Sequence, residues 1–297
     1  MSDAVFAGIE TGGTKILARV VDAAGNILAD GRWRTTTPAA ALGDLLAFIA
    51  GAVPPGRKLA AVGMAAFGPV VCDARSSDYG RVLSTPKPHW ANSNLRAALA
   101  EHLRAPVVLE HDVNAAALAE WHGGAGRGLH SLAYVTVGTG IGGGLLINGR
   151  PLEGALHPEI GHIRLARRAD DTVPSVCPFH DDCAEGLASG PAVAGRLKKG
   201  ADLAGDATLR ALMGSYLGDL AAALVLAWSP QRIVIGGGVM NTPQLLGQLH
   251  RALVSALSGY EVGEHVKQED FCVLPAFADA GLEGALLMAR GLARQGD

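Results

Sequence analysis

The feature that most constrains the fold of this chain is an arrangement that occurs twice: a short apolar strand, a glycine turn and a second strand. In the first copy, the apolar segment 5–9 leads into glycines at 12–13, and the chain returns as a strand over 16–21. In the second copy, the strand 132–137 leads into the glycine loop 138–144 and then into another apolar strand. Strands and helices alternate after each copy, a pattern that predicts an α/β fold. We therefore expect a duplicated architecture of two α/β domains with a cleft between them.

The rest of the chain supplies further strands and alanine- and leucine-rich helices. A length of 297 residues suits about two domains of ~150 residues each. We place an N-terminal domain at 1–111 and a C-terminal domain at 112–279 with an insertion at about 157–186, and we expect the last helix, about 280–297, to pack back on the first domain. The other expected strands are 26–33, 59–66, 107–109, 232–235 and 271–274. One expected helix begins at 35–38 and reaches residue 50, and a second is capped by Ser93 and reaches residue 103. The remaining expected helices are 112–123, 206–228 and 280–292.

Composition and charge narrow the classes of function. The net charge is −3, the pI is about 6.4 and there is no basic run, so nothing marks a nucleic-acid or membrane-surface partner. The N-terminus lacks the charged and apolar regions of a signal peptide, and no unbroken apolar window approaches ~18 residues. Four cysteines fit a reducing interior. We expect a soluble cytoplasmic protein with no nucleic-acid or membrane partner.

One segment contains two cysteines and two histidines at a spacing typical of a metal site. Cys177, His180 and Cys183 follow one another at intervals of three residues, and His162 lies upstream, separated from Cys177 by fourteen residues. A tetrahedral zinc site takes such a set of two thiolates and two imidazoles. The alternatives are a disulfide between the two cysteines and an ordinary polar loop. Because the chain lacks the secretory signals that a stable disulfide requires, we favour zinc.

Two carboxylates flank this cluster. Glu159 lies three residues before His162, and Glu185 lies two residues after Cys183. A metal ion that fixes the loop also fixes the directions of these side chains. We therefore interpret the zinc as the structural support of a binding site that uses Glu159 and Glu185.

The loop from Gly138 to Gly143 satisfies the pattern G-x-G-x-x-G, which by itself suggests a dinucleotide-binding fold. That interpretation requires the loop to open a helix, whereas this loop leads into a second strand. We favour a β-turn that binds phosphate, because bare glycines such as Gly140 let backbone N–H groups approach anionic oxygens and Thr139 adds a hydroxyl donor.

The first glycine turn offers the same chemistry. Gly12, Gly13 and Thr14 are followed by Lys15, which adds a positive charge. Neither turn has the spacing of a Walker P-loop. Two such hairpins facing each other would hold the phosphates of one nucleotide from both sides. The alternative for each turn alone is an ordinary tight hairpin.

Asp112 follows the strand 107–109 and begins a helix, where an isolated aspartate most often serves as a cap. The helix dipole also keeps such a carboxylate ionised, which suits a group that accepts a proton from a substrate hydroxyl. Phosphoryl transfer requires little more from the protein than positioning, charge neutralisation by Mg²⁺ and one such acceptor. Asp112 is therefore our candidate for the general base.

Taken together, these residues resemble the ROK (repressor, ORF, kinase) family of bacterial sugar kinases, in the actin/hexokinase-like ATPase superfamily. The resemblance covers nearly the whole chain. It implies a duplicated ribonuclease H-like two-domain fold, a sugar acceptor, ATP, Mg²⁺ and Zn²⁺, and a homodimer. The segments that carry it are 8–15 and 137–144 for the phosphate motifs, 112–120 for the catalytic aspartate, 159–162 with 177–185 for the sugar and zinc signature, and 235–239 for the adenosine pocket.

The resemblance also implies a role for each matching residue. Asp112 is the base that activates the sugar hydroxyl. Glu159, His162 and Glu185 hold sugar hydroxyls, and His162 uses one ring nitrogen for the sugar and the other for zinc. The other sugar-binding residues are His111, Gly68 and Pro69, the nucleotide-binding residues are Glu10, Gly12, Gly13, Thr14, Lys15, Gly138, Thr139, Gly140, Gly236, Gly237 and Gly238, and the zinc ligands are His162, Cys177, His180 and Cys183.

Three departures from the usual family pattern point to one branch. Glu10 stands where most of the superfamily has aspartate, and His111 stands where glucokinase-like members usually have a sugar-binding asparagine. The metal cluster is Cys-x₂-His-x₂-Cys rather than the three-cysteine form. Together with segments 67–70 and 84–90, these departures resemble the fructokinase branch. This implies D-fructose as the acceptor, phosphorylated at its 6-hydroxyl.

Other functions remain as alternatives. A sugar-responsive regulator of this family carries an N-terminal helix-turn-helix segment, for which a phosphate motif at residue 8 leaves no room. A non-catalytic sugar-binding protein is disfavoured by Asp112 and the glycine loops. A kinase for glucose, mannose or N-acetylmannosamine is the nearest alternative, and His111 argues against glucose. Lys87 and Trp90 either face the sugar or belong to a surface loop bracketed by prolines.

Overall fold

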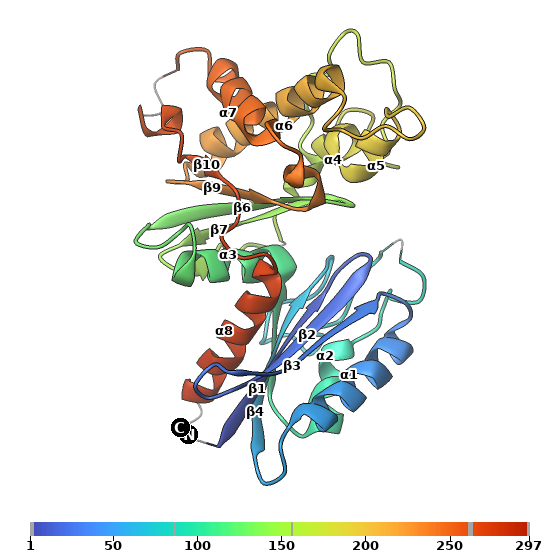
Figure 1. Cartoon of the computed structure of the whole chain (residues 1–297), viewed down its shortest axis with the longest axis vertical. Helices are drawn as coiled ribbons and strands as arrows, with labels where there is room; N and C mark the ends of the chain where they lie inside the picture. The colour runs from blue at the N-terminus through green and yellow to red at the C-terminus, as the bar shows by residue number, and fades with distance from the viewer. Residues whose placement is uncertain (1–2, 86, 156, 261–263, 296–297) are drawn as a thin grey trace. The chain divides into compact units, whose positions relative to one another are not determined.

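The computed structural model describes residues 3–85, 87–155, 157–260 and 264–295, so Pro86 of the segment 84–90 and the chain ends lie outside the described part. The chain divides into two compact units, and each is described by itself. Unit 1 comprises residues 1–119 and 277–297, and unit 2 comprises residues 120–276. Each unit contains one five-stranded sheet with helices packed on it (Figure 1).

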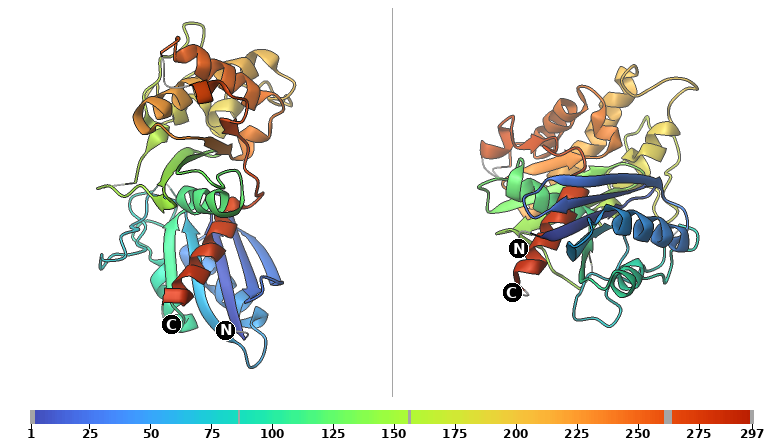
Figure 2. Two further views of the ribbon diagram at one scale, coloured as in Figure 1. Left: turned by 90° about the vertical axis from the view of Figure 1, so that its left-hand side faces the viewer. Right: turned by 60° about the horizontal axis from the view of Figure 1, so that its bottom comes forward.

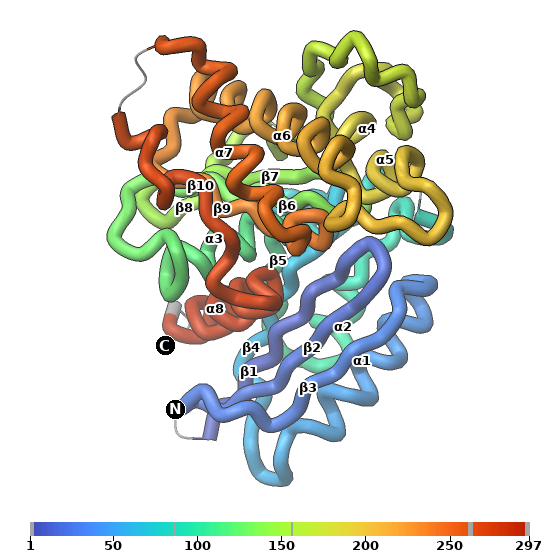
Figure 3. Tube along the Cα trace, turned by 45° about the horizontal axis from the view of Figure 1, so that its top comes forward, coloured from blue at the N-terminus to red at the C-terminus, as the bar shows by residue number. Residues whose placement is uncertain are grey.

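The sheet of unit 1 begins with an antiparallel meander of three strands and continues with two parallel strands. The order across the sheet is β3-β2-β1-β4-β5, and Figure 3 shows the first four side by side. Apolar side chains fill β1, of which five successive residues are buried. The strands are β1 (Ala4–Thr11), β2 (Lys15–Asp22), β3 (Ile27–Arg34), β4 (Lys58–Ala66) and β5 (Val107–His111).

Two helices cover one face of this sheet, α1 (Pro38–Ala52) and α2 (Leu95–Leu103). Thr37 caps α1 by accepting a hydrogen bond from the backbone N–H of Ala40. The expected cap of α2 was wrong by one residue. Asn94 Oδ1 accepts from the N–H of Ala97 at 2.9 Å, whereas the Ser93 hydroxyl donates to a backbone carbonyl upstream. An amide oxygen one residue later reaches the free N–H groups of the first turn, which is what a cap requires.

The other face of the sheet is covered by α8 (Ala280–Gln295), which packs on β1 and β4, as the left view of Figure 2 shows. Small residues permit this close contact. A Cβ at Gly63 of β4 would lie 1.8 Å from the carbonyl oxygen of Ala285, so only glycine fits there. The terminal helix thus completes the core of unit 1, with Leu286 and Ala289 buried against Phe6 and Ala61.

The sheet of unit 2 repeats the topology of unit 1. Its order is β10-β9-β6-β7-β8, with β6, β7 and β8 forming an antiparallel meander and β9 and β10 added in parallel beside β6. Written in the opposite direction, this order is β8-β7-β6-β9-β10, which is the order of unit 1 with five added to each strand number. The strand pairing therefore confirms the predicted duplication. The strands are β6 (Ser131–Val137), β7 (Ile141–Ile147), β8 (Arg150–Pro151), β9 (Ile233–Gly236) and β10 (Cys272–Val273).

The second glycine loop is shorter than the sequence suggested. Strand β7 begins at Ile141 and includes three glycines that pair in register with β6, whereas we expected them in the loop. A Cβ at Gly143 would lie 2.8 Å from the side chain of Ile160. Gly143 therefore makes room for the segment around Ile160, and the sequence alone does not distinguish such a strand glycine from a loop glycine.

The helices of unit 2 pack on its sheet around the central helix α6 (Ala207–Trp228). By length and composition α6 could cross a membrane, but more than half of its apolar window is buried inside unit 2, which is typical of a core helix. The long helix α3 (Asp112–Gly123) spans the boundary between the units. The remaining helices are α4 (Ala184–Ala188), α5 (Gly190–Ala194) and α7 (Leu245–Ala256), with short 3₁₀ turns η1 (Ile160–His162), η2 (Gly238–Asn241) and η3 (Glu264–Lys267).

A buried ion pair anchors the irregular segment 157–186 to the core of unit 2. Arg196 donates to both carboxylate oxygens of Asp171, at 3.1 and 2.8 Å, and the hydroxyl of Tyr216 donates to Asp171 at 2.8 Å. The two charged side chains are only 2% and 4% exposed. Burial alone would raise the pKa of Asp171, but the hydrogen bonds from Arg196 and Tyr216 outweigh it and hold this pKa below its usual value.

Replacing Asp171 with asparagine is expected to lower the free energy of unfolding by about 3 kcal/mol at pH 7, because it leaves the buried charge of Arg196 without its partner. The sign of the pH dependence follows from the lowered pKa. The stabilisation is complete well above the unfolded pKa of about 3.9 and is lost as the pH falls toward the folded value. The difference between wild type and variant, measured by urea unfolding, should therefore narrow below about pH 4. Asp73→Asn, in an exposed pair with Arg75, is the control and should change nothing measurable. If wild type and Asp171→Asn differed in unfolding free energy by the same amount at every pH, the ionised Asp171–Arg196 pair would not be the source of the stabilisation.

Candidate active site and metal centre

The sheet of unit 1 brings three predicted motifs to one edge. Thr11 of β1 pairs with Ala66 of β4, and Ala66 pairs with His111 of β5, so the three parallel strands end side by side. The first glycine turn, the Gly68–Pro69 segment and Asp112 follow directly from these ends. Parallel strands collect functional groups at their carboxyl ends, and the strand register explains why segments so far apart in sequence meet here.

The first glycine turn is a tight hairpin held by its own backbone and by Thr35. The N–H of Gly12 donates to the carbonyl of Lys15 at 2.8 Å, and the Thr35 hydroxyl donates to the carbonyl of Gly12 at 2.7 Å. The ammonium of Lys15 lies 3.3 Å from a carboxylate oxygen of Asp279, just before α8. Sequence reasoning missed this partner, since nothing in the motif indicates an acid 264 residues away.

Glu10 precedes this turn and is the strongest candidate there for holding a cation. Its Oε2 is buried without a hydrogen-bond partner among the described residues. Burial raises the pKa of Glu10, and the carboxylate of Asp279 also acts to raise it, whereas the ammonium of Lys15 and a backbone hydrogen bond from Leu282 to the carboxylate act to lower it. A buried carboxylate oxygen with no donor, beside a glycine turn, fits a site for Mg²⁺ or for its bound water.

At the end of the sheet, β5 presents His111 against the Gly68–Pro69 segment. His111 is only 5% exposed, and a Cβ at Gly68 would lie 3.3 Å from its ring. The structure therefore brings together the three unit 1 residues that we expected to bind sugar. Glycine at position 68 leaves room for an imidazole at position 111.

Asp112 is the first residue of α3, and its Oδ1 accepts from the N–H of Val113 at 2.9 Å. Its neighbour Glu110 braces the junction between strand and helix. Glu110 Oε1 accepts from the N–H of His111 at 2.7 Å and from the side-chain amide of Asn114 at 3.1 Å. Sequence reasoning missed Glu110, although an acid directly before the His-Asp pair at a strand end was a usable signal.

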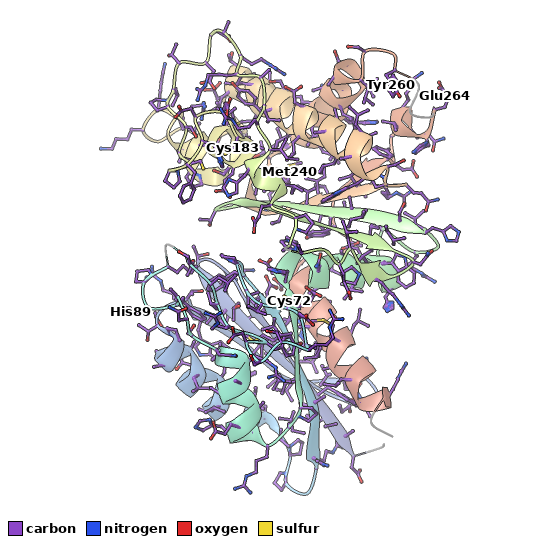
Figure 4. All side chains as sticks on the ribbon, turned by 180° about the vertical axis from the view of Figure 1, so that it is seen from behind. Cys72, His89, Cys183, Met240, Tyr260 and Glu264 are labelled. Atoms are coloured by element: carbon purple, nitrogen blue, oxygen red, sulfur yellow. The ribbon has the colours of Figure 1, made fainter. Side chains whose placement is uncertain are left out.

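Cys72, labelled in Figure 4, contacts Glu110. Burial raises the pKa of the Cys72 thiol far above its ordinary value, and the carboxylate of Glu110 raises it further. The thiol therefore stays neutral, so it acts as a hydrogen-bond donor to the bracing carboxylate and not as a nucleophile.

In unit 2, the second glycine turn and the glycines after β9 also meet at one edge. Thr136 of β6 pairs with Gly236 of β9, so the loop at 138–140 and the turn at Gly237 follow neighbouring strand ends. The N–H of Gly138 donates to the carbonyl of Gly140 at 2.9 Å. The predicted nucleotide-binding residues of this unit thus form one group: Gly138, Thr139, Gly140, Gly236, Gly237 and Gly238.

Gly237 is required by both its backbone and its surroundings. Its φ is +94°, and a Cβ there would lie 2.3 Å from the carbonyl oxygen of Val137. Gly237→Ala is expected to cost roughly 2–4 kcal/mol of stability, from strain and overpacking together. The adjacent Gly238→Ala is a matched control, because a Cβ at Gly238 meets nothing within 4 Å. Thermal unfolding of both variants tests this, and equal melting temperatures would contradict it.

The two carboxylates around the Cys/His cluster lie close to this second glycine turn. Glu185 Oε2 accepts from the N–H of Ile141 at 3.0 Å, directly after Gly140. Burial raises the pKa of Glu159, with His162 acting to lower it and Glu185 to raise it. Because His162 and Glu185 both affect the pKa of Glu159, the three side chains lie close enough to interact electrostatically. Two carboxylates and an imidazole at one place can bind several hydroxyls.

The four predicted metal ligands converge. One ligand atom from each of His162, Cys177, His180 and Cys183 lies within 4.8 Å of all the others. Nδ1 of His162 is 3.8 Å from each sulfur, and Nδ1 of His180 is 3.7 Å from the sulfur of Cys177. Bond lengths of about 2.3 Å to sulfur and 2.0 Å to nitrogen place neighbouring ligands of a tetrahedral zinc roughly 3.6 Å apart. The donor set and its spacing therefore fit Zn²⁺.

The surrounding loop fixes these ligands in place. Both cysteines have free thiols, so the disulfide alternative is wrong. Cys183, labelled in Figure 4, also caps α4 by accepting from the N–H of Gly186, and the Ser175 hydroxyl donates to the carbonyl of His180 at 2.7 Å. In His162, Nδ1 faces the sulfurs, which leaves Nε2 for another partner.

Of the two residues in the segment 84–90 that we considered for the sugar, Trp90 does not face it. Its side chain is 1% exposed in the core of unit 1, and its indole N–H donates to the carbonyl of Thr36 at 2.7 Å. Its ring also packs edge-on against Phe67. An apolar side chain of this size contributes more when it is buried in the core than when it lies in a loop.

Comparison with known proteins identifies the class to which this fold and site belong. A model of the ROK family matches residues 6–291. The chain belongs to the ROK family, as the sequence predicted. A fructokinase of Zymomonas mobilis is 39% identical over 291 residues, which are 96% of each chain, and a putative fructokinase of Bacillus subtilis is 36% identical over 96% of this chain and 95% of its own length.

Solved structures agree with this assignment. A ROK family glucokinase of Streptomyces griseus, in complex with glucose and AMPPNP, has a TM-score of 0.76 at 29% identity, covering 97% of this chain and 99% of its own. A ROK hexokinase of Thermus thermophilus has a TM-score of 0.74 at 30% identity, covering 98% and 99%. The predicted actin/hexokinase-like fold of two α/β units is confirmed.

Proposed function

We propose that this protein transfers the γ-phosphoryl group of ATP to the 6-hydroxyl of D-fructose, forming fructose 6-phosphate and ADP. The observation that carries the proposal is the similarity to curated fructokinases along almost the whole chain, at 32–39% identity for five of them. His111 supports the same acceptor, because it is buried against Gly68 at the position where glucokinase-like members usually have asparagine.

In this proposal Asp112 accepts the proton of the attacking hydroxyl. Its place at the first residue of α3 keeps it ionised through the helix dipole. Glu110 holds the strand end from which Asp112 projects. Glu159, Glu185 and Nε2 of His162 hold fructose hydroxyls, and carboxylates suit this because each oxygen accepts more than one hydrogen bond. His111, Gly68 and Pro69 complete the acceptor site.

The two glycine turns hold the phosphates of ATP through backbone N–H groups. Glu10 binds Mg²⁺ or its water, which neutralises phosphate charge when bound. The glycines 236–238, which follow the strand end beside the second glycine turn, receive the adenosine. The second glycine turn is held by Glu185 through the N–H of Ile141, so sugar binding at Glu185 and phosphate binding at the turn are mechanically linked.

We assign His162, Cys177, His180 and Cys183 to a structural zinc ion. This ion supplies no chemistry to phosphoryl transfer. It fixes the chain on both sides of the segment 163–176, and with it the directions of Glu159 and Glu185. We also expect a homodimer and a cytoplasmic location, in line with the substrates that we propose.

The test is to incubate the purified protein with MgATP and fructose and to identify the product by ³¹P and ¹³C NMR. The proposal predicts stoichiometric ADP and fructose 6-phosphate. Fructose 1-phosphate would keep the kinase and contradict the position of transfer. A second candidate function, phosphorylation of another hexose, is favoured by the N-acetylgalactosamine kinase of a Shewanella strain, which is 30% identical over 97% of this chain.

A further inference from the structure

Lys87 lies between the first phosphate turn and the segment expected to bind sugar. Its ammonium donates a hydrogen bond to the carbonyl oxygen of Gly13, 74 residues away in sequence. It also lies 5.2 Å from the centroid of the Phe67 ring, which directly precedes Gly68 and Pro69. One cation thus contacts both the glycine turn and the edge of the acceptor segment, all within unit 1.

The charges around the first glycine turn explain why another cation is needed there. Lys15, which the motif suggests as the phosphate-binding lysine, is paired with Asp279 at 3.3 Å. Glu10 adds a second carboxylate that interacts with both of them. Both carboxylates compete with phosphate for the ammonium of Lys15, so Lys15 by itself holds an anion poorly at this turn. The ammonium of Lys87 brings a second positive charge to the turn itself.

We propose that Lys87 is the residue that neutralises the transferred phosphoryl group, exchanging the carbonyl of Gly13 for a phosphate oxygen when MgATP binds. The inference rests on the proposed kinase function and adds a catalytic residue to it. In the reaction the bond from the β–γ bridging oxygen to the γ-phosphorus breaks and the electron pair leaves with ADP. The fructose oxygen forms the new bond to phosphorus, and its proton passes to Asp112. Lys87 stays protonated throughout and hydrogen-bonds the charged oxygens of the group in transfer.

The environment of Lys87 supports this role. Partial burial lowers the pKa of the Lys87 ammonium, so this group has lost part of its hydration and gains from an anionic partner. A backbone carbonyl is a weak, neutral acceptor. Exchanging it for an anionic phosphate oxygen replaces an ordinary hydrogen bond with a charge-assisted one, which is roughly twice as strong.

The experiment compares Lys87→Met with Lys58→Met, which removes the same charge from an exposed residue at the opposite end of β4. We expect Lys87→Met to lower kcat at least ~100-fold, as removal of one donor to a transition-state oxyanion does. The KM for fructose should stay within about threefold, because the acceptor site is intact. Calorimetry should show weaker binding of Mg-AMPPNP and unchanged binding of MgADP, since only the triphosphate carries the group that Lys87 contacts. Lys58→Met should match wild type.

Chemical rescue separates this role from a structural one. In Lys87→Ala, added methylammonium should restore part of kcat, because a free cation can occupy the vacated place. A kcat within about threefold of wild type in Lys87→Met, or equal losses of MgADP and Mg-AMPPNP affinity, would overturn the proposal. The binding measurement does not depend on the acceptor. If Lys87→Met weakens Mg-AMPPNP binding but the wild-type protein phosphorylates no fructose, the fructose assignment fails, whereas the contact of Lys87 with the γ-phosphate is supported.

Discussion

Replacing Asp112 with asparagine is expected to lower kcat by roughly 100- to 10,000-fold, the range that a positioned general base contributes. Asparagine has nearly the same shape and keeps an oxygen for the N–H of Val113, which the aspartate accepts at 2.9 Å. The helix and the acceptor site should therefore remain formed. What is lost is the ability to take the proton from the fructose hydroxyl. Steady-state kinetics should show the loss in kcat, and calorimetry should still detect fructose binding.

The control for this variant is Asp44→Asn, which makes the same chemical change at an exposed position in α1 and should leave the kinetics unchanged. Circular dichroism and thermal unfolding of both variants check that the fold is intact. Near-normal turnover by Asp112→Asn would remove Asp112 as the base. Loss of fructose binding together with turnover would instead make it a binding residue.

Replacing Cys177 with serine is expected to remove the metal and loosen sugar binding. Cys177 is buried, and its sulfur is the ligand atom that faces both imidazoles, at 3.8 and 3.7 Å. A serine hydroxyl is a far weaker zinc ligand than a thiolate, so bound zinc should fall from about one ion per chain to nearly none. Glu159 and Glu185 then lose their anchor. We expect the KM for fructose to rise on the order of tenfold or more, together with a lower melting temperature.

Phe179→Ala serves as the control for the metal loop, because this side chain lies between the ligands in sequence and is 79% exposed. It should retain the full zinc content, measured by elemental analysis, and the wild-type KM. Chelation of zinc from the wild-type protein should reproduce the effect of Cys177→Ser. Full activity of metal-free protein would show that the metal is not coupled to the sugar site.

The sequence predicted the fold well because its strongest signals are local. Each strand–glycine–strand hairpin is specified within about 20 residues by apolar runs and glycines, and the two copies produced two sheets of the same topology. The convergence of the four cysteine and histidine side chains was predictable for the same reason, since three of them lie within seven residues and a tetrahedral site calls for a fourth.

What the sequence did not reveal depends on contacts between distant segments. The pairing of Lys15 with Asp279, the contact of Lys87 with Gly13 and the burial of Trp90 all join residues more than 50 positions apart. No local pattern encodes such contacts, because the sheet register and the return of α8 create them. The bracing by Glu110 was missed for another reason: its hydrogen bonds are local, but an acid at a strand end has many ordinary uses.

The identity of the acceptor is tested most directly by MgATP-dependent ADP release from the purified protein with fructose, glucose, mannose and N-acetylmannosamine in parallel. We expect the highest kcat/KM with fructose, by at least an order of magnitude, because a site that pairs its polar groups with one sugar leaves them unsatisfied with another. A higher kcat/KM with any other of these sugars would contradict the fructose assignment, and absence of ADP release with all four would contradict a kinase that acts on any of them.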